Sequence, residues 1–254
     1  MARVSEIARV AADAGDAAAE ALRRDGIVAI EGLWSPDTID ALRATVEAQH
    51  PEFADPDALE DYLGDKHERF IAPVALTAAV RESGLCTNER LEAVNAAMLG
   101  DDYVYEAFGV LMVRPGAPAQ EPHRDGGLLF PETGVDRILP PSALTVAIPL
   151  VDVTADYAPT GAAPGSHRNQ AAADPADLIP IDLNRGDAAI WDFRTNHAGL
   201  ANRTDRARPA LYFTVCRPYW IDHKNFHANA RAKLVGDPAV LTELGPRFVR
   251  GRPW

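Results

Sequence analysis

The 254-residue sequence contains only two cysteines, Cys86 and Cys216. Two isolated cysteines supply neither a disulfide framework nor a Cys-x-x-Cys metal site. Long apolar runs are missing too, since no run approaches the about 18 residues that span a bilayer. Charged side chains interrupt the first 22 residues, so we expect no signal peptide. These absences predict a cytoplasmic protein.

Basic residues are also fewer than acidic residues. The 25 lysines and arginines are outnumbered by 37 acidic residues, which gives a net charge of -12. Such a surface repels the phosphates of nucleic acids and anionic lipids. We therefore expect no nucleic-acid partner, no membrane partner and a small-molecule substrate, while the oligomeric state cannot be inferred.

Several common catalytic motifs do not occur in the sequence. It has no GxSxG, Walker A, HExxH or GxGxxG motif. Hydrolases with a nucleophile elbow, P-loop NTPases, zincins and Rossmann enzymes thus lack their usual signatures. The chemistry has to come from histidines and carboxylates.

The predicted elements change from mainly helices to mainly strands near Gly100. Before it, helical spacing predicts one helix over 4–24 and another over 88–99, with a short strand at 27–30. A further helix is predicted to begin at Pro36, with Ser35 as its N-cap. After it, β-rich runs are separated by Pro, Gly and Asp turns, at 103–113, 143–151, 188–193 and 209–217. Helices followed by strands favour an antiparallel sheet or barrel over a βαβ repeat.

The most informative short motif is His123-Arg124-Asp125. On an extended segment, residues i and i+2 point to the same face, so His123 and Asp125 could bind one metal ion. A second His-x-acid pair, His50-Pro51-Glu52, falls at the end of a predicted helix and is a weaker candidate. Gly126 and Gly127 follow Asp125, and because they lack side chains they leave room for another group to approach the backbone closely.

A third ligand must come from later in the chain. The candidates are His167, His197, His223 and His227. His197 follows a predicted strand and precedes Arg208, which opens the next strand, by 208 − 197 = 11 positions. His167 lies in a predicted turn, where an imidazole more often hydrogen-bonds to the backbone than binds a metal. Neither His223 nor His227 is followed by a cationic residue 11 positions later. We therefore favour His197.

Two histidines and one carboxylate on one face of an octahedron suit a non-haem Fe(II) oxygenase. The three remaining positions accept a bidentate 2-oxo acid and dioxygen. The far carboxylate of a dicarboxylate cosubstrate needs a cation, and a guanidinium offers a planar, permanently charged partner. Arg208 fits that requirement.

The chain resembles the phytanoyl-CoA dioxygenase (PhyH) family of Fe(II)/2-oxoglutarate-dependent oxygenases over most of its length. The motifs that carry the resemblance are individually weak, but their order and spacing together are fairly specific. They are Arg24-Asp25-Gly26-Ile27-Val28-Ala29-Ile30, Ser35-Pro36, His123-x-Asp125, Thr160-Gly161, Pro164-Gly165-Ser166-His167, Gly186-Asp187, His197 and Arg208.

The resemblance implies a mainly β fold with N-terminal helices, a double-stranded β-helix or cupin-like jelly roll. It implies one oxygenase domain over 1–254, with a mainly helical layer at 1–100, the jelly-roll core at 101–220 and a tail at 221–254. It also implies Fe(II) on His123, Asp125 and His197 and 2-oxoglutarate on Arg208, with Gln120 and Thr145 as further cosubstrate contacts.

The activity implied is oxidation, by default hydroxylation, of an unactivated C–H bond in a small metabolite. Segments that could cover the barrel mouth are mainly apolar, at 70–76, 128–130 and 219–220. We assign Arg137 and Arg194 to the surface, so a largely hydrophobic substrate is expected, such as a natural-product intermediate.

Three alternatives remain open. An amino-acid hydroxylase of the same family would use the same metal residues. A Zn-dependent hydrolase or isomerase on a cupin-like barrel would activate water with the same triad, although it would not need Arg208. A jelly roll without catalysis could simply bind a ligand.

Overall fold

The computed structural model describes residues 6–54, 68–169, 171–221 and 234–248. Its centre is a seven-stranded sheet in the order β1-β2-β9-β6-β11-β5-β3, accompanied by a three-stranded sheet, β10-β7-β8, and a two-stranded one, β12-β4. The strands are β1 (Arg9–Ala11), β2 (Ile27–Glu31), β3 (Arg69–Pro73), β4 (Ala75–Leu76), β5 (Val104–Val113), β6 (Ala143–Pro149), β7 (Thr160–Ala162), β8 (Ile179–Ile181), β9 (Ala188–Asp192), β10 (His197–Gly199), β11 (Arg208–Cys216) and β12 (Val235–Gly236).

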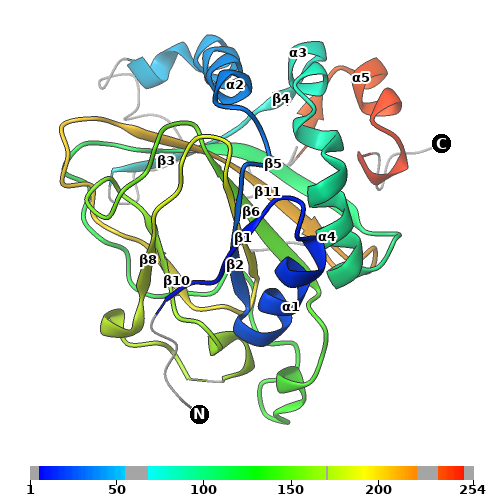
Figure 1. Cartoon of the computed structure of the whole chain (residues 1–254), viewed down its shortest axis with the longest axis vertical. Coiled ribbons are helices and arrows are strands. Elements are labelled where there is room, and N and C mark those ends of the chain that lie inside the picture. The colour runs from blue at the N-terminus through cyan, green and yellow to red at the C-terminus, as the bar shows by residue number, and fades with distance from the viewer. Residues whose placement is uncertain (1–5, 55–67, 170, 222–233, 249–254) are drawn as a thin grey trace.

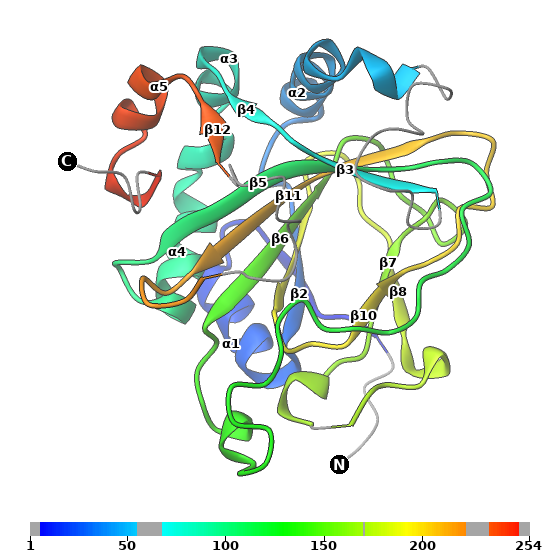
Figure 2. The same ribbon diagram turned by 180° about the vertical axis from the view of Figure 1, so that it is seen from behind.

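The helices lie on one side of the large sheet, and β7, β8 and β10 lie on the other (Figure 1, Figure 2). They are α1 (Gly15–Asp25), α2 (Pro36–Gln49), α3 (Ala78–Glu82), α4 (Glu89–Leu99) and α5 (Pro238–Glu243). All pairings within the large sheet are antiparallel except β1 with β2. Two facing, largely antiparallel sheets confirm the predicted jelly roll.

Local sequence explains where the N-terminal elements begin. Ser35 accepts a hydrogen bond from the Thr38 amide at the start of α2, and Pro36 occupies its first turn. Asn88 caps α4 in the same way. The predicted helix over 4–24 was wrong in its first half, because residues 9–11 pair with β2 as strand β1 and the helix begins only at Gly15. Tertiary pairing overrides helical spacing there.

The two faces of β11 have different neighbours. Leu211, Phe213 and Val215 belong to the large apolar core that includes residues of α1, α2 and α4. The alternate residues face the small sheet, and they are Arg208, Ala210, Tyr212, Thr214 and Cys216. This second face forms an inner surface with the guanidinium of Arg208 at one end and the thiol of Cys216 at the other.

The first 100 residues contribute more than a helical layer, since β1, β2 and β3 belong to the large sheet. Of the predicted tail, only 234–248 and residue 221 are described, and α5 forms within it. None of the helices in the described part of the chain combines the length and apolar character that crossing a bilayer requires.

Candidate metal centre

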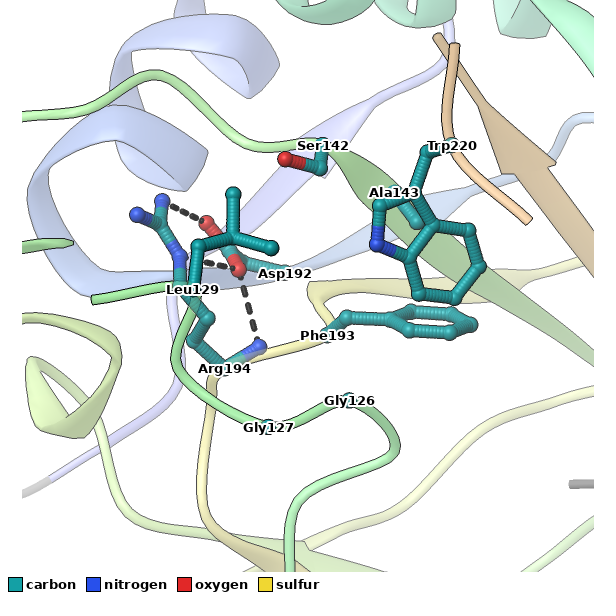
Figure 3. A pocket seen from close by; sticks show the side chains of 9 residues that line it. All are labelled: Gly126, Gly127, Leu129, Ser142, Ala143, Asp192, Phe193, Arg194 and Trp220. Atoms are coloured by element: carbon teal, nitrogen blue, oxygen red, sulfur yellow. Dashed lines mark hydrogen bonds and ion pairs between the residues drawn. The ribbon is translucent and has the colours of Figure 1, made fainter. Parts of the chain in front are cut away.

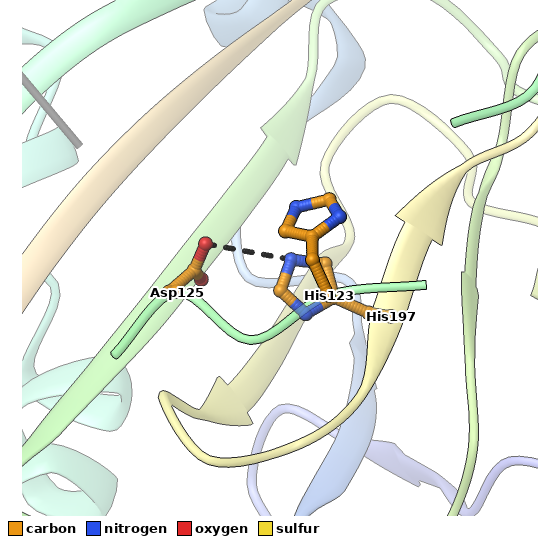
Figure 4. Close-up of side chains that lie close together, drawn as sticks. All are labelled: His123, Asp125 and His197. Atoms are coloured by element: carbon orange, nitrogen blue, oxygen red, sulfur yellow. Dashed lines mark ion pairs between the residues drawn. The ribbon is translucent and has the colours of Figure 1, made fainter. Parts of the chain in front are cut away.

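His123, Asp125 and His197 lie together, as the sequence predicts (Figure 4). One potential ligand atom from each residue lies within 4.8 Å of those of the other two. They come from different parts of the chain, since His123 and Asp125 precede β6 whereas His197 opens β10. The fold therefore brings together three potential metal ligands from segments more than 70 residues apart.

Backbone hydrogen bonds hold the two ligand segments side by side. The amide of His123 donates to the carbonyl of His197, and the amide of His197 donates to the carbonyl of His123, both at 2.9 Å. The Gly126 amide extends the pairing by donating to the Phe193 carbonyl at 3.1 Å. This short antiparallel ladder sets the distance between the two segments that carry the candidate ligands.

Both imidazoles are oriented by backbone carbonyls. Nδ1 of His123 lies 2.9 Å from the Glu121 carbonyl, and Nδ1 of His197 lies 3.0 Å from the Thr195 carbonyl. A carbonyl only accepts hydrogen bonds, so in the neutral rings Nδ1 carries the proton and Nε2 the lone pair. Such partners fix the tautomer and orientation of metal-binding histidines.

Asp125 has two oxygens with different surroundings. Oδ2 accepts hydrogen bonds from the Thr145 hydroxyl at 2.6 Å and from the Trp191 indole at 2.9 Å. Oδ1 lies 3.5 Å from Nε2 of His197. Burial alone would raise the pKa of Asp125, but the charge and hydrogen bond of His197 in its protonated form, with the donors Thr145 and Trp191, hold it well below its ordinary value. The group is an anionic carboxylate with one oxygen directed toward His197.

Thr145 and Trp191 are neighbours on the inner face, on β6 and β9. The structure places Thr145 against Asp125, and its predicted contact with the cosubstrate stays a prediction. Trp191, which the sequence suggests is a core residue, is indeed buried, but it also binds Asp125. Only the pairing of β6 with β9 reveals this role, because Trp191 is 66 positions from Asp125.

Arg208 is buried at the start of β11 and faces the same interior. Its Nε donates to the Ala158 carbonyl at 3.0 Å. Within the described residues, no ion pair joins it to an aspartate or glutamate. A buried guanidinium without a carboxylate partner is costly, and it creates a favourable position for a bound anion.

A second buried guanidinium, Arg69 of β3, escaped the sequence analysis. Both Arg69 and Arg208 lie opposite Val113 of the intervening strand β5. Arg69 donates to the carbonyls of Pro118 and Leu200, at 2.6 and 2.9 Å. Burial and the positive charge of Arg208 lower the pKa of Arg69 to about 10. The two like charges strengthen the attraction for an anion at this end of the barrel.

Gln120 has a structural contact beside the ligand ladder. Its side-chain oxygen accepts a hydrogen bond from the Gly199 amide at 2.9 Å, while its own backbone amide donates to the Gly199 carbonyl. The residue thus continues the pairing between the His123 segment and β10. Its predicted contact with the cosubstrate stays a prediction.

The other histidines lie apart from the triad where they are described. His50 contacts the Glu52 carboxylate and the Pro73 carbonyl, both at 2.9 Å. His167 is buried in a turn and accepts a hydrogen bond from Arg168. Both positions agree with the sequence analysis. His223 and His227 lie outside the described residues.

Two expectations about the barrel mouth were wrong. Arg194 is buried, not on the surface, because its guanidinium binds both oxygens of Asp192, at 2.9 and 2.6 Å. Residues 70–76 do not cover the mouth, because all but Val74 belong to strands β3 and β4, and both Phe70 and Val74 are buried. Arg137 is exposed, as expected.

A jelly roll with two histidines, an aspartate and a buried arginine facing its interior has the features of a non-haem Fe(II)/2-oxoglutarate oxygenase. The chain belongs to the phytanoyl-CoA dioxygenase (PhyH) family, whose model matches residues 22–210. Membership confirms the predicted family and the predicted class of oxidoreductase, with iron and 2-oxoglutarate as its cofactors.

Two relatives illustrate the family. Dioxygenase FrzG of Cladobotryum sp is 29% identical over 235 residues, which cover 82% of this chain and 77% of that protein. The iron/alpha-ketoglutarate-dependent dioxygenase ausU of Aspergillus calidoustus is 27% identical over 205 residues, which cover 76% and 68%.

Solved structures show the same fold. The epimerase SnoN, crystallised with Fe3+, alpha-ketoglutarate and nogalamycin RO, has a TM-score of 0.62 at 22% identity, covering 81% of this chain and 84% of that one. AviO1 from Streptomyces viridochromogenes Tue57 has a TM-score of 0.61 at 24% identity, covering 80% and 95%.

Proposed function

We propose that the chain uses 2-oxoglutarate and dioxygen to hydroxylate an unactivated C–H bond of a small, largely hydrophobic metabolite, such as a natural-product intermediate. His123, Asp125 and His197 bind Fe(II), and Arg208 binds the far carboxylate of 2-oxoglutarate. The small molecule is the partner that the inner surface accommodates. The enzyme acts as one domain over 1–254 in the cytoplasm.

The donor set fits Fe(II). Both imidazoles present Nε2 in the tautomer that can bind a metal, and Asp125 is ionised. Thr145 and Trp191 engage one carboxylate oxygen, so the other is the natural metal ligand. Three protein ligands leave room for a bidentate cosubstrate and oxygen. Zinc would suit a similar set, but a hydrolase would have no use for the buried Arg208.

The end of the site that would bind the cosubstrate is positively charged. Arg208 offers a planar donor pair to a carboxylate, and Arg69 adds positive potential beside it. Both guanidiniums are buried, so water competes weakly for a bound anion. We propose Gln120 and Thr145 as additional polar contacts near the cosubstrate, consistent with their places beside His123 and Asp125.

When bound, iron supplies the oxidising chemistry, in which 2-oxoglutarate and oxygen give succinate, carbon dioxide and an oxidised substrate. The chain's own residues orient the reactants. The ladder between His123 and His197 holds the ligands in register, and Thr145 and Trp191 keep Asp125 from rotating.

The relatives support a substrate from secondary metabolism. SnoN is described as an epimerase from nogalamycin biosynthesis and SnoK as a carbocyclase from the same pathway. We propose hydroxylation because it requires no group on the substrate beyond the C–H bond itself.

The observation that carries the proposal is the placement of the three metal-binding residues and Arg208 on one interior surface. Measuring succinate release from 2-oxoglutarate with added Fe(II) tests it. Release that depends on iron supports an oxygenase, whereas no release with either Fe(II) or Zn(II) would favour a protein that only binds ligand. Zn-dependent hydrolysis or isomerisation without release would favour a cupin-type hydrolase or isomerase.

A further inference from the structure

Tyr212 differs in burial from the rest of β11, the strand that begins with Arg208. Every other residue of this strand is buried, whereas Tyr212 is only partly buried. Strands β5 and β6 pair with β11 on its two sides, so the accessible surface of Tyr212 belongs to its side chain. That side chain packs against apolar residues between the two sheets, which include Trp191. The interior of the barrel is therefore open to solvent next to the Tyr212 ring.

The neighbours of Tyr212 in the large sheet are small. Gly109 of β5 and Ala147 of β6 lie directly opposite it, and Ala189 of β9 continues the row. Residues that pair in this way project from the same face of a sheet. Since these neighbours carry at most a methyl group, the Tyr212 ring projects beyond them into the interior.

On one side, Tyr212 adjoins the candidate metal centre. Its ring meets the Trp191 ring edge to face, with centroids 6.2 Å apart. The Trp191 ring also packs on the His197 ring, with centroids 4.9 Å apart, and its indole donates to Oδ2 of Asp125. Tyr212 is thus linked to two potential metal ligands through one aromatic side chain.

On the other side, Tyr212 adjoins the two buried guanidiniums. Burial and the charge of Arg208 lower the pKa of Arg69, whereas Tyr212 acts on it in the opposite direction. Electrostatic interactions decrease with distance, so the phenol of Tyr212 lies near the Arg69 guanidinium. The tyrosine is therefore placed between the metal centre and the positive charges.

The distance between these two ends suits a dicarboxylate. Arg69 donates to the Gly199 carbonyl at 3.2 Å. Gly199 is two positions beyond His197 on β10, which is roughly 7 Å along one face of the strand. This spacing is comparable with the length of a five-carbon chain. A 2-oxo acid held at the metal can therefore reach the guanidiniums with its far carboxylate.

The groups at this end can accept such a ligand. Within the part of the chain that the structure describes, neither the Tyr212 hydroxyl nor the terminal nitrogens of Arg208 make a hydrogen bond, and the bond from Arg208 to Ala158 uses Nε. Another buried guanidinium, that of Arg194, does not compete for an anion, because it binds both oxygens of Asp192 (Figure 3). A phenol hydroxyl inside a protein usually has a hydrogen-bond partner, and a bound carboxylate would supply one.

We propose that the Tyr212 hydroxyl donates a hydrogen bond to the far carboxylate of 2-oxoglutarate, beside the guanidinium of Arg208. This inference rests on the proposed function, which makes 2-oxoglutarate the cosubstrate. The hydroxyl and the guanidinium approach the carboxylate from different positions on the strand, so together they fix its orientation. Tyr212 therefore contributes to the preference for a dicarboxylate over 2-oxo acids that lack the far carboxylate.

The test measures binding rather than turnover. The full chain, loaded with Fe(II) in the absence of oxygen, is titrated by calorimetry with 2-oxoglutarate and with 2-oxopentanoate, which has a methyl group in place of the far carboxylate. Tyr212→Phe removes the hydroxyl and keeps the ring against Trp191. We expect this variant to bind 2-oxoglutarate about tenfold more weakly or worse, as the loss of a hydrogen bond to a charged group predicts, and to bind 2-oxopentanoate unchanged.

Two controls separate this contact from a general effect on the site. The Fe(II) affinity of Tyr212→Phe, measured without cosubstrate, should be unchanged, because Trp191 still donates to Asp125. Tyr103→Phe removes a hydroxyl from the large apolar core, where it contacts Arg247. This variant should bind both 2-oxo acids as the unaltered protein does.

Four results would overturn the role of Tyr212. They are an unchanged affinity of Tyr212→Phe for 2-oxoglutarate, an equal loss for both acids, a loss of Fe(II) affinity, and an equal loss in Tyr103→Phe. If the preference for 2-oxoglutarate persists in Tyr212→Phe, the oxygenase stands and the role of Tyr212 is rejected. If the unaltered protein shows no preference for 2-oxoglutarate or binds neither acid, the proposed function is rejected, and the role of Tyr212 with it.

Discussion

Thr145 donates its hydroxyl proton to Oδ2 of Asp125 over 2.6 Å, although it lies on the central strand β6 and Asp125 on a loop. We expect Thr145→Val to keep the shape of the side chain but to lower Fe(II) affinity about 10- to 100-fold, as losses of such supporting partners do. Thr145→Ser, which retains the hydroxyl, should restore most of the affinity. Metal titration by calorimetry measures both, and unchanged affinity in Thr145→Val would contradict the role.

The proposed metal-binding residues should be essential for turnover but not for folding. His123→Ala, Asp125→Ala and His197→Ala each remove one ligand atom from the interior without emptying the large apolar core. We expect succinate release to fall to background in each variant while the circular dichroism spectrum is retained. Near-normal turnover in any of the three would show that the triad is assigned incorrectly.

Arg208→Ala should raise the concentration of 2-oxoglutarate that the enzyme needs. Removing one partner of a buried charge pair costs about 2 to 5 kcal/mol, which corresponds to at least about a 25-fold loss of affinity. Arg203→Ala is the matched control, because Arg203 is mostly exposed and pairs with Asp156 at the surface. Cosubstrate titration of the succinate assay distinguishes them, and equal KM values would reject the anchor.

Acid should destabilise the metal-free protein partly through His167. Burial is the main cause that lowers the pKa of His167, so the unfolded chain takes up a proton near the ordinary value of about 6.5 while the folded chain does not. The contribution of His167 to the free energy of unfolding is therefore fully present above that pH. It decreases below that pH by up to about 1.4 kcal/mol per pH unit. Urea midpoints measured between pH 7 and 5 should fall less steeply in His167→Gln. Identical slopes would show that His167 is not responsible.

Gly26 and Gly32 form a natural pair for a stability experiment. Both have positive φ, 74° and 70°, but a Cβ on Gly26 would overlap the His167 ring whereas one on Gly32 would meet nothing within 4 Å. The left-handed backbone costs alanine about 1 to 2 kcal/mol at either site. Overlap should add about 1 to 3 kcal/mol at Gly26 alone. Denaturant unfolding of the two alanine variants compares them directly.

The parts of this site that could be predicted from sequence are those with a short-range pattern. His123 and Asp125 lie two positions apart on an extended segment, and the 11-residue interval between His197 and Arg208 bridges one turn. The supporting residues could not be found in this way. Trp191 and Arg69 look like ordinary core or surface residues until strand pairing brings them beside Asp125 and Arg208.

The errors have a similar origin. Residues 9–11 have helical spacing but form a strand because β2 offers an edge with which they can pair. Arg194 seemed to be a surface residue because charged side chains are rarely buried without a partner. Its partner Asp192 is two positions away, and the backbone turn between them brings both side chains inside.

The residues proposed to support iron and cosubstrate and the exposed apolar side chains come from different kinds of structure. Thr145, Trp191 and Arg208, which we propose support iron and cosubstrate, are on strands of the large sheet, whereas the exposed large apolar side chains of the described residues come from the segments at 129–138 and 219–221, outside that sheet. Substitutions of these exposed side chains should alter neither the pairing of the strands nor the ladder between His123 and His197. Such a scaffold can acquire new substrates during evolution while the oxidation chemistry is inherited unchanged.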